Sequence, residues 1–181
     1  MKPLADISIF KEISARVYEK KADHCFSSRE RHHHLIYVDS MEDLSEMLLC
    51  CTLACRTRSW TGDYHKRVRP PFLSITLIHS GETAVRIGED FFLAEEGDLI
   101  LFPPYGDYEY MTFGNSERSA GLFAGKSLLS VLESSGLKNR YCIQLQHPEK
   151  VEEYFRQISD TLSEGFRFSA RRALAGICFE L

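Results

Sequence analysis

The chain has 181 residues, of which 44% are hydrophobic and 27% are charged, and its formal net charge is −4. This length suits one domain with a sizeable core, and the composition is that of a folded globular protein. The negative charge argues against a strongly basic nucleic-acid surface, although a local basic patch remains open. No apolar run reaches the ~20 residues that cross a bilayer, and residues 1–10 lack the apolar core of a signal peptide. We therefore expect a cytoplasmic protein with no membrane partner.

The first 50 residues predict two helices and one short strand. Apolar side chains at helical spacing predict a helix over residues 7–20, and a second helix is expected over residues 41–50. A β-branched and aromatic run predicts a strand over residues 35–38. We expect residues 1–50 to be an extension that packs on the main domain.

Cysteine and histidine clusters in this region raise the question of a metal site. Cys50, Cys51 and Cys55 are close enough in sequence to be weighed as a zinc cluster. They lack a second spaced pair and lie in an apolar run, where reduced cysteine packs as a small hydrophobe. His32 and His34 would share one face of a strand, but a solvated strand is the favoured interpretation there. No metal is therefore expected.

The central stretch, residues 73–110, consists of short apolar segments separated by glycine turns. Strands of this length, with turn signals every ~8–12 residues, are typical of a small barrel or sandwich. Pro103 and Pro104 end the series, because proline cannot donate a ladder hydrogen bond. A strand is also expected before it, over residues 51–60. After it, a hairpin is expected with its turn at Gly114–Ser116. Residues 51–125 therefore predict a β-barrel.

The last part of the chain, residues 126–181, predicts helices. Apolar spacing predicts helices over residues 127–135 and 149–163, with a short strand over residues 141–145 between them. A further helix begins near Ser169 and is still running at Leu181, so we expect more protein to follow. The apolar stripe of the helix over residues 149–163 either packs on the barrel or forms a dimer seam.

One segment carries a family resemblance. From Gly97 to Tyr110 the chain reads Gly-Asp, four apolar residues, Pro-Pro and then Tyr-Gly-Asp-Tyr-Glu-Tyr. This resembles the N-terminal regulatory domain of AraC-family transcription regulators, where Gly-Asp, an apolar strand and Pro-Pro-Gly precede a His and a Tyr. The likeness extends to Phe123–Gly125 with helices after it, and covers residues 51–181. Cupin barrels in general share the first part, and the helical tail favours the regulator.

The resemblance implies a cupin-like double-stranded β-helix barrel that binds a small effector, a helical hairpin that forms a homodimer, and C-terminal helix-turn-helix units that bind DNA. DNA contact would then belong to protein beyond Leu181. Residues 1–50 lie outside the resemblance. The candidate dimerisation residues are those of the apolar stripe: Val151, Tyr154, Phe155, Ile158 and Leu162.

The alternative function is a free-standing cupin that binds a small molecule, or a metal-dependent cupin enzyme. Metal cupins need two His one residue apart, a Glu beyond them and a later His. Here Glu109 stands at the later position, and the strand before Gly88 offers only His79. One imidazole with scattered carboxylates is a poor transition-metal site. The chain also lacks a Gly-x-Ser-x-Gly motif and a glycine-rich phosphate loop, so we expect no enzyme activity and no cofactor.

Candidate effector-binding residues follow from strand alternation. If Glu109 faces the barrel interior, Met111 shares its face, and Arg118 on the returning strand would be its partner. A buried Glu109 must be paired, so Glu109 and Arg118 would form a structural ion pair or an effector clamp. Both side chains could instead be solvated at the barrel mouth.

Four further positions complete the candidate site. On the central strand, either Ser74, Thr76 and Ile78 face inward, which suits a ligand pocket, or Ile75, Leu77 and His79 do, which suits a core. Arg67 and Arg69 could reach the same mouth. The sequence therefore predicts as effector a sugar or another hydroxylated or anionic metabolite.

Overall fold

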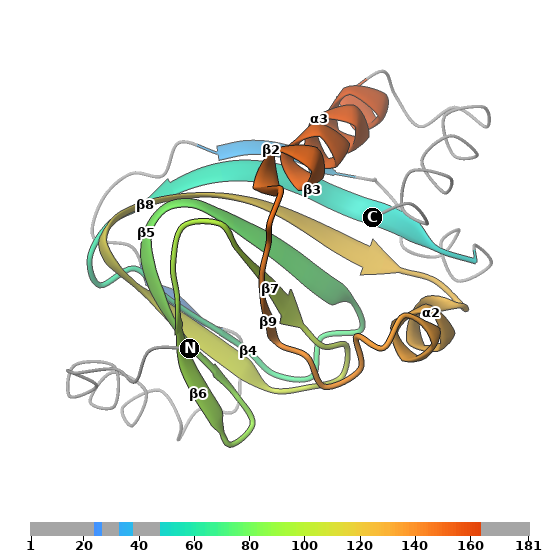
Figure 1. Cartoon of the computed structure of the whole chain (residues 1–181), viewed down its shortest axis with the longest axis horizontal. Helices are drawn as coiled ribbons and strands as arrows, with labels where there is room; N and C mark the ends of the chain where they lie inside the picture. Colours follow the sequence, from blue (N-terminus) through green and yellow to red (C-terminus); the bar gives the residue numbers. More distant parts are fainter. Residues whose placement is uncertain (1–23, 27–32, 38–47, 164–181) are drawn as a thin grey trace.

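Long antiparallel strands dominate the computed structural model, which describes residues 24–26, 33–37 and 48–163. Figure 1 shows these strands curving around a common interior, with the helices on the outside. The strands are β1 His24–Phe26, β2 His33–Tyr37, β3 Cys50–Ser59, β4 Tyr64–Arg67, β5 Leu73–Ile87, β6 Asp90–Ala94, β7 Asp98–Phe102, β8 Tyr108–Ala124 and β9 Cys142–Gln144. The helices are α2 Leu128–Ser134 and α3 Pro148–Ser163.

Several expected elements are confirmed, and others lie outside the described residues. The strand expected over residues 51–60 is β3, and those expected over residues 35–38 and 141–145 are β2 and β9. The helices expected over residues 127–135 and 149–163 are α2 and α3. The expected helices over residues 7–20 and 169–181 lie outside the described residues, as does most of the one over residues 41–50. The predicted end of the helix over residues 41–50 is wrong, because Cys50 already belongs to β3.

The strands β5 and β8 pair with each other along their length and take part in two layers of the barrel. The first half of β5 also pairs with β7, and its second half pairs with β6. The beginning of β8 pairs with β4, whereas its end pairs with β3. One layer therefore contains β2, β3, β7 and β9, the other contains β1, β4 and β6, and the two long strands join them (Figure 1).

The glycine turns predicted at Gly88 and Gly97 separate β5 from β6 and β6 from β7, whereas those predicted at Gly81 and Gly114 are bends within the two long strands. Residues 73–79 and 83–87 belong to one strand, β5, and the hairpin predicted around Gly114 is wrong because residues 108–124 form β8. Gly81 has a φ of +80°, and a Cβ there would lie 2.2 Å from the Asn115 carbonyl oxygen. The pairing is irregular between Ile78 and Glu82. Both strands thus turn the corner between the layers together, at a place where only glycine fits.

The irregularity exchanges the faces of β5. Before it, Ser74 and Thr76 face the barrel interior, where they line a cavity, while Leu77 belongs to the core under the helices. After it, Val85 and Ile87 belong to the interior cluster with Phe92, Ile100 and Phe102. A one-residue slip in a strand moves every later side chain to the other face, and this bulge has that effect.

A second core lies between the first layer and the helices. Leu77, Leu101 and Phe123 on the outer face of the sheet pack with Phe155 and Ile158 of α3. Figure 1 shows α3 lying across β3 and β8, with α2 on another part of the barrel. The stripe of α3 therefore packs on the barrel of its own chain at these two positions. Of the described helices, neither is long and apolar enough to cross a membrane.

Candidate functional site

A cavity of about 240 Å³ opens into the barrel interior between β3, β4, β5 and β8. Its wall combines aliphatic and aromatic side chains with hydroxyl groups and cations, as is common for small-molecule sites. The lining residues are Leu53, Cys55, Thr57, Ser59, His65, Arg67, Phe72, Ser74, Thr76, Tyr108, Tyr110, Arg118, Ala120 and Leu122.

Arg118 is the most buried cation of this wall, with only 5% of its surface exposed. Its Nε donates a hydrogen bond to Thr57 Oγ1 at 3.3 Å, and its Nη2 donates one to Ser59 Oγ at 2.8 Å. Thr57 is the register partner of Arg118 across β3, so the strand pairing itself brings these groups together. Two neutral hydroxyls hold the guanidinium in place, but they do not neutralise its charge.

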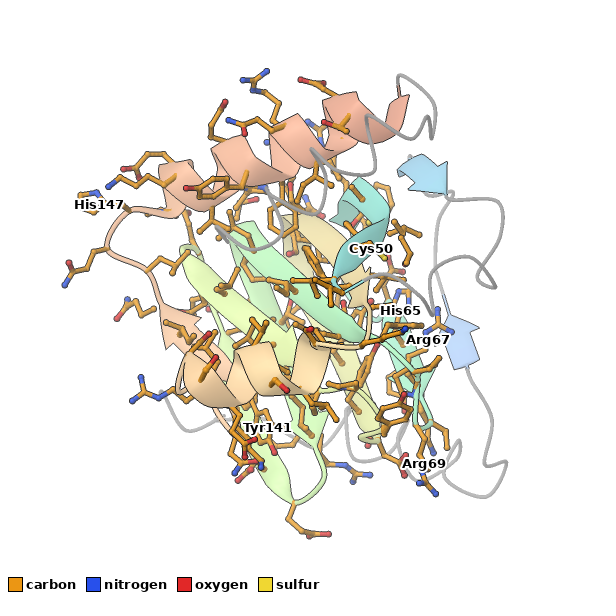
Figure 2. The ribbon with its side chains drawn as sticks, turned by 90° about the vertical axis from the view of Figure 1, so that its right-hand side faces the viewer. Cys50, His65, Arg67, Arg69, Tyr141 and His147 are labelled. Atoms are coloured by element: carbon orange, nitrogen blue, oxygen red, sulfur yellow. The ribbon has the colours of Figure 1, made fainter. Side chains whose placement is uncertain are left out.

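Aromatic rings form the side of the cavity next to Arg118. The Arg118 Cζ lies 4.7 Å from the centroid of the Tyr110 ring, within the range of a cation–π contact. His65 is the register partner of Tyr110 and stacks on it at 4.6 Å between ring centroids. Figure 2 shows His65 and Arg67 close together on β4. The rings fix the position of the guanidinium and present flat apolar surface to a ligand.

Among the described residues, the cavity wall contains cations and no carboxylate. Its ionisable residues are Arg118, Arg67, His65, Cys55 and two tyrosines, and no Asp or Glu is among the described residues that line it. Burial raises the pKa of the Cys55 thiol, and the opposing effect of nearby Arg118 is smaller. Cys55 therefore stays a neutral thiol near pH 7 and does not balance the Arg118 charge.

Four of the seven predicted effector residues line this cavity. Ser74 and Thr76 do so from β5, which decides between the two faces that the sequence left open. Arg67 and Arg118 line it from β4 and β8. Arg69 is exposed and does not; its backbone N–H donates to Asp107 Oδ1 in the loop beside it. Figure 2 places Arg69 away from His65 and Arg67, toward the lower end of the barrel.

The predicted shared face of Glu109 and Arg118 is wrong. Tyr108 and Tyr110 face the cavity, so Glu109 and Met111 point to the opposite side of β8. Glu109 is buried there, where it accepts hydrogen bonds from the Tyr64 hydroxyl and the Arg86 guanidinium. Arg86 is its register partner on β5. The charge of Glu109 is thus neutralised across the strand pair, which removes the reason for placing it beside Arg118.

Met111 belongs to a small cluster on the same outer face. It packs with Tyr64 and Ala84, both fully buried, and with the partly buried rings of Phe91 and Phe113. Its surroundings are those of a core methionine, and it does not line the cavity.

Sequence reasoning missed the hydroxyl pair and the aromatic side of the cavity. Cys55, Thr57 and Ser59 lie two residues apart on β3 and therefore share its inward face. That alternation was present in the sequence and could have found them. His65 and Tyr110 meet only through the pairing of β4 with β8, which no sequence spacing shows.

The His, Cys, Asp and Glu side chains of the described part of the chain are dispersed. No group of three or more His, Cys, Asp or Glu side chains there is arranged to hold a metal ion. Cys50 and Cys51 are buried in β3, where their thiols donate to the carbonyl oxygens of Ala124 and Leu53, and Cys55 lines the cavity. His79, the one imidazole of the central strand, contacts Ser119 Oγ at 2.8 Å instead.

An ionic network joins strands β3 and β8 to α3. The Arg56 guanidinium binds Glu117 on β8 and Glu152 on α3, each at 2.8 Å. The Nδ1 of His79 lies 4.0 Å from the second carboxylate oxygen of Glu152. Glu117 and Ser119 point outward to this network, whereas Arg118 between them points inward to the cavity. The two faces of one short segment of β8 thus meet the cavity and α3.

Comparison with solved structures shows a likeness to regulators and to cupins. The AraC-like transcriptional activator CuxR matches with a TM-score of 0.54 at 9% identity, covering 94% of this chain and 64% of CuxR. A Schizosaccharomyces pombe Cnp3 cupin domain has a TM-score of 0.43 at 11% identity, covering 63% of this chain and 75% of that one. A conserved Streptococcus pyogenes protein of unknown function has a TM-score of 0.45 at 12% identity, covering 55% of this chain and 79% of that one. At these identities the likeness concerns the fold alone, and of the three only CuxR exceeds a TM-score of 0.5. This chain spans less than two thirds of CuxR.

Comparison at the level of sequence identifies the family. No protein in the curated set matches the chain significantly. The family model for the AraC-like ligand binding domain matches residues 51–179, which is more than half of the chain. The match covers the described lining of the cavity, both described helices and the strands of the barrel other than β1 and β2. The chain therefore belongs to the AraC-like ligand-binding domain family, with a cupin-like barrel followed by helices.

Proposed function

We propose that this chain is the effector-sensing regulatory domain of an AraC-type transcription regulator, and that it binds its effector in the cavity around Arg118. The family membership supports the regulatory role, because members are defined by their ligand-binding domain. The observation that carries the proposal is the cavity itself. It lies inside the barrel and is lined by hydroxyls, aromatic rings and a fixed guanidinium.

The size of the cavity limits the effector to a small metabolite. Its volume of about 240 Å³ lies below the ~300–1,000 Å³ that is usual for drug-sized ligands. A monosaccharide or a short organic acid suits this space, whereas a nucleotide exceeds it. The domain acts by binding, and we propose no enzymatic step for it.

DNA binding and dimerisation complete the proposed role. DNA contact would belong to a helix-turn-helix domain of the same regulator, in the cytoplasm. A homodimer would form through the C-terminal helices. Phe155 and Ile158 are buried against the barrel, so a seam on α3 would use the half-buried Val151 and Tyr154. The side chain of Leu162 lies outside the described residues. Sedimentation equilibrium showing a strict monomer at high protein concentration would contradict the dimer.

Ligand titration of the chain tests the effector site. The probes are two monosaccharides (D-glucose and D-xylose), glycerol, and two carboxylates (propionate and lactate). Thermal unfolding and calorimetry measure the binding of each probe. A ligand at about 100 times its Kd stabilises the folded state by about 2.7 kcal/mol. We expect at least one of these classes to bind and to raise the Tm.

Two variants with the same new side chain provide the control. Thr76→Leu fills the cavity and is expected to abolish binding. Ser130→Leu adds the same leucine to the exposed surface of α2 and should leave binding unchanged. If no probe binds, or if Thr76→Leu binds as well as the unaltered chain, the cavity is not the effector site.

A further inference from the structure

The charge of Arg118 is not balanced by any carboxylate in the part of the chain that the structure describes. Its neighbours there are two hydroxyls, an aromatic ring and a thiol that burial keeps neutral. The one buried carboxylate of β8, Glu109, is on the opposite face with Arg86. A buried cation without a counter-charge is costly, and proteins usually pair it. An anion that enters the cavity would supply the missing charge.

The hydrogen bonds of Arg118 leave one edge of the guanidinium for a ligand. Guanidinium carries five N–H donors in a rigid planar fork. The Nε and Nη2 groups donate to Thr57 and Ser59 and so use the side edge of this fork. Nη1 makes no hydrogen bond to another described residue. Because Arg118 lines the cavity, the terminal edge formed by Nη1 and Nη2 remains for a bound molecule.

The hydroxyls around Arg118 favour a ligand that accepts hydrogen bonds. Thr57 and Ser59 accept from the guanidinium, so each keeps its own O–H to donate elsewhere. Ser74 and Thr76 add two further hydroxyls to the wall from β5. The described lining of the cavity therefore offers hydroxyl and guanidinium donors but no charged acceptor.

We propose that the effector carries a carboxylate group, which binds the terminal edge of Arg118 and accepts hydrogen bonds from the neighbouring hydroxyls. The two oxygens of a carboxylate match the planar fork in a bidentate pair. A neutral sugar would leave the cation unbalanced. The inference rests on the proposed function, because it names the ligand chemistry of the same cavity.

Matched acids and amides test the charge directly. The ¹⁵N-labelled chain is titrated with acetate, propionate and lactate, and in parallel with acetamide, propionamide and lactamide, at constant ionic strength in a buffer without carboxylates. Inorganic phosphate and glycerol are the further arms. We expect a saturable shift of the Arg118 Nε–H resonance with each acid, and at least tenfold weaker binding of each amide.

Substitutions test whether Arg118 is the group that binds. Arg118→Lys keeps the charge but loses the planar fork, and is expected to weaken lactate binding at least tenfold, measured on the backbone amide of Thr76. Arg140→Lys makes the same change on the surface and should leave lactate binding unchanged. Should Arg118→Lys not fold, Ser59→Ala keeps the arginine and removes one supporting hydroxyl. We expect that variant to bind lactate several-fold more weakly.

The outcomes separate this inference from the proposed function. Equal binding of acids and amides, or binding of glycerol or phosphate without the acids, overturns the inference that the effector carries a carboxylate. Such a result still supports the cavity as the effector site. Unchanged lactate binding in Arg118→Lys overturns the role of Arg118. If none of these probes binds, the carboxylate inference fails, and the effector cavity is then decided by the monosaccharide titrations described above.

Discussion

Arg118 and Glu109 are two buried charged side chains of β8 whose partners differ. Glu109 is 2% exposed and is paired with Arg86 and Tyr64 on the outer face. Arg118 is 5% exposed and lies among neutral groups on the inner face. Removing one partner of a buried pair leaves the other uncompensated, whereas removing an unpaired buried charge relieves a cost. The two positions should therefore respond in opposite directions to the same substitution.

We predict that Arg118→Met keeps or raises the free energy of unfolding, by up to about 1–2 kcal/mol, and that Glu109→Met lowers it by about 2–4 kcal/mol. Both variants introduce the same unbranched apolar side chain into β8. Urea denaturation without ligand measures both values. A marked loss of stability in Arg118→Met would show that the arginine serves the fold, and that its unbalanced charge is not kept for a ligand.

The corner of β5 and β8 is the element that makes a barrel out of two layers. At this corner Gly81 approaches the backbone of β8 so closely that a Cβ would lie 2.8 Å from Ser116 Cα as well as 2.2 Å from the Asn115 oxygen. Gly62 has a similar φ, +87°, but nothing lies within 4 Å of the place of its Cβ. The two glycines thus separate the cost of a left-handed backbone from the cost of a clash.

We predict that Gly81→Ala lowers the free energy of unfolding by more than about 3 kcal/mol, and that Gly62→Ala lowers it by only about 1 kcal/mol. The second substitution adds backbone strain alone, whereas the first also forces the two strands apart. Chemical denaturation of both variants gives the difference. Equal losses in both would mean that the close approach at the corner relaxes without cost.

The helix α3 is held to the barrel by apolar packing and by the ionic network around Glu152. Phe155 enters a recess above Gly121, where a Cβ would meet its ring at 3.0 Å. Beside it, Ile158 is fully buried in the same core. These two positions of the stripe are therefore used within the chain, and the proposed seam would use the half-buried Val151 and Tyr154.

We predict that Phe155→Ala lowers the free energy of unfolding by about 3–5 kcal/mol, because it removes a buried ring from the core. Arg156→Ala, one position along on the exposed face, loses only surface ion pairs and should cost about 0.5 kcal/mol. Thermal and urea unfolding provide the comparison. A negligible effect of Phe155→Ala would indicate that α3 does not pack on the barrel in solution.

In the whole molecule, the cavity and α3 meet opposite faces of one segment of β8. Arg118 faces the cavity, while its neighbours Glu117 and Ser119 contact the residues that hold α3, Arg56 and His79. The site is thus linked to α3 by three consecutive residues of β8 and by the contacts of Arg56 and His79 with Glu152. Within the network, burial first and nearby Arg56 second lower the pKa of His79 below its ordinary value.

We predict that the domain loses stability on acidification through the His79 site. Since the pKa of His79 is lowered in the folded state, the unfolded chain takes up the proton first as the pH falls. The contribution of His79 to the free energy of unfolding is therefore present above about pH 6.5 and is lost below it. The measurement is urea denaturation at pH 7.5 and pH 5. His79→Gln should show a smaller loss than the unaltered chain.

The exposed His147, at the start of α3, provides the matched control. Figure 2 shows it at the edge of the molecule, away from the cavity residues of β4. His147→Gln should keep the full acid loss of the unaltered chain. A loss in His79→Gln that equals that of the unaltered chain would exclude His79 as its source.

Much of the fold was open to prediction from local patterns. Apolar spacing placed both α2 and α3, the latter through Phe155 and Ile158, because helical periodicity is a property of neighbours in sequence. The strand ends at Pro103 were equally local. The hairpin at Gly114 was wrong because a glycine permits a turn and a bend alike, and the choice depends on the partner strand.

Sequence by itself determined the family pattern, the strand-rich barrel with its trailing helices, and the need for a partner wherever a charge is buried. Tertiary structure alone decided which partner each charge has. The bulge at Gly81 sets which face of β5 points into the barrel. The register of β8 against β5 places Glu109 opposite Arg86. Arg118 is thereby left with Thr57 and Ser59 at the cavity. Alternation along one strand fixes which residues share a face, but only the pairing of strands distant in sequence fixes which face is the interior.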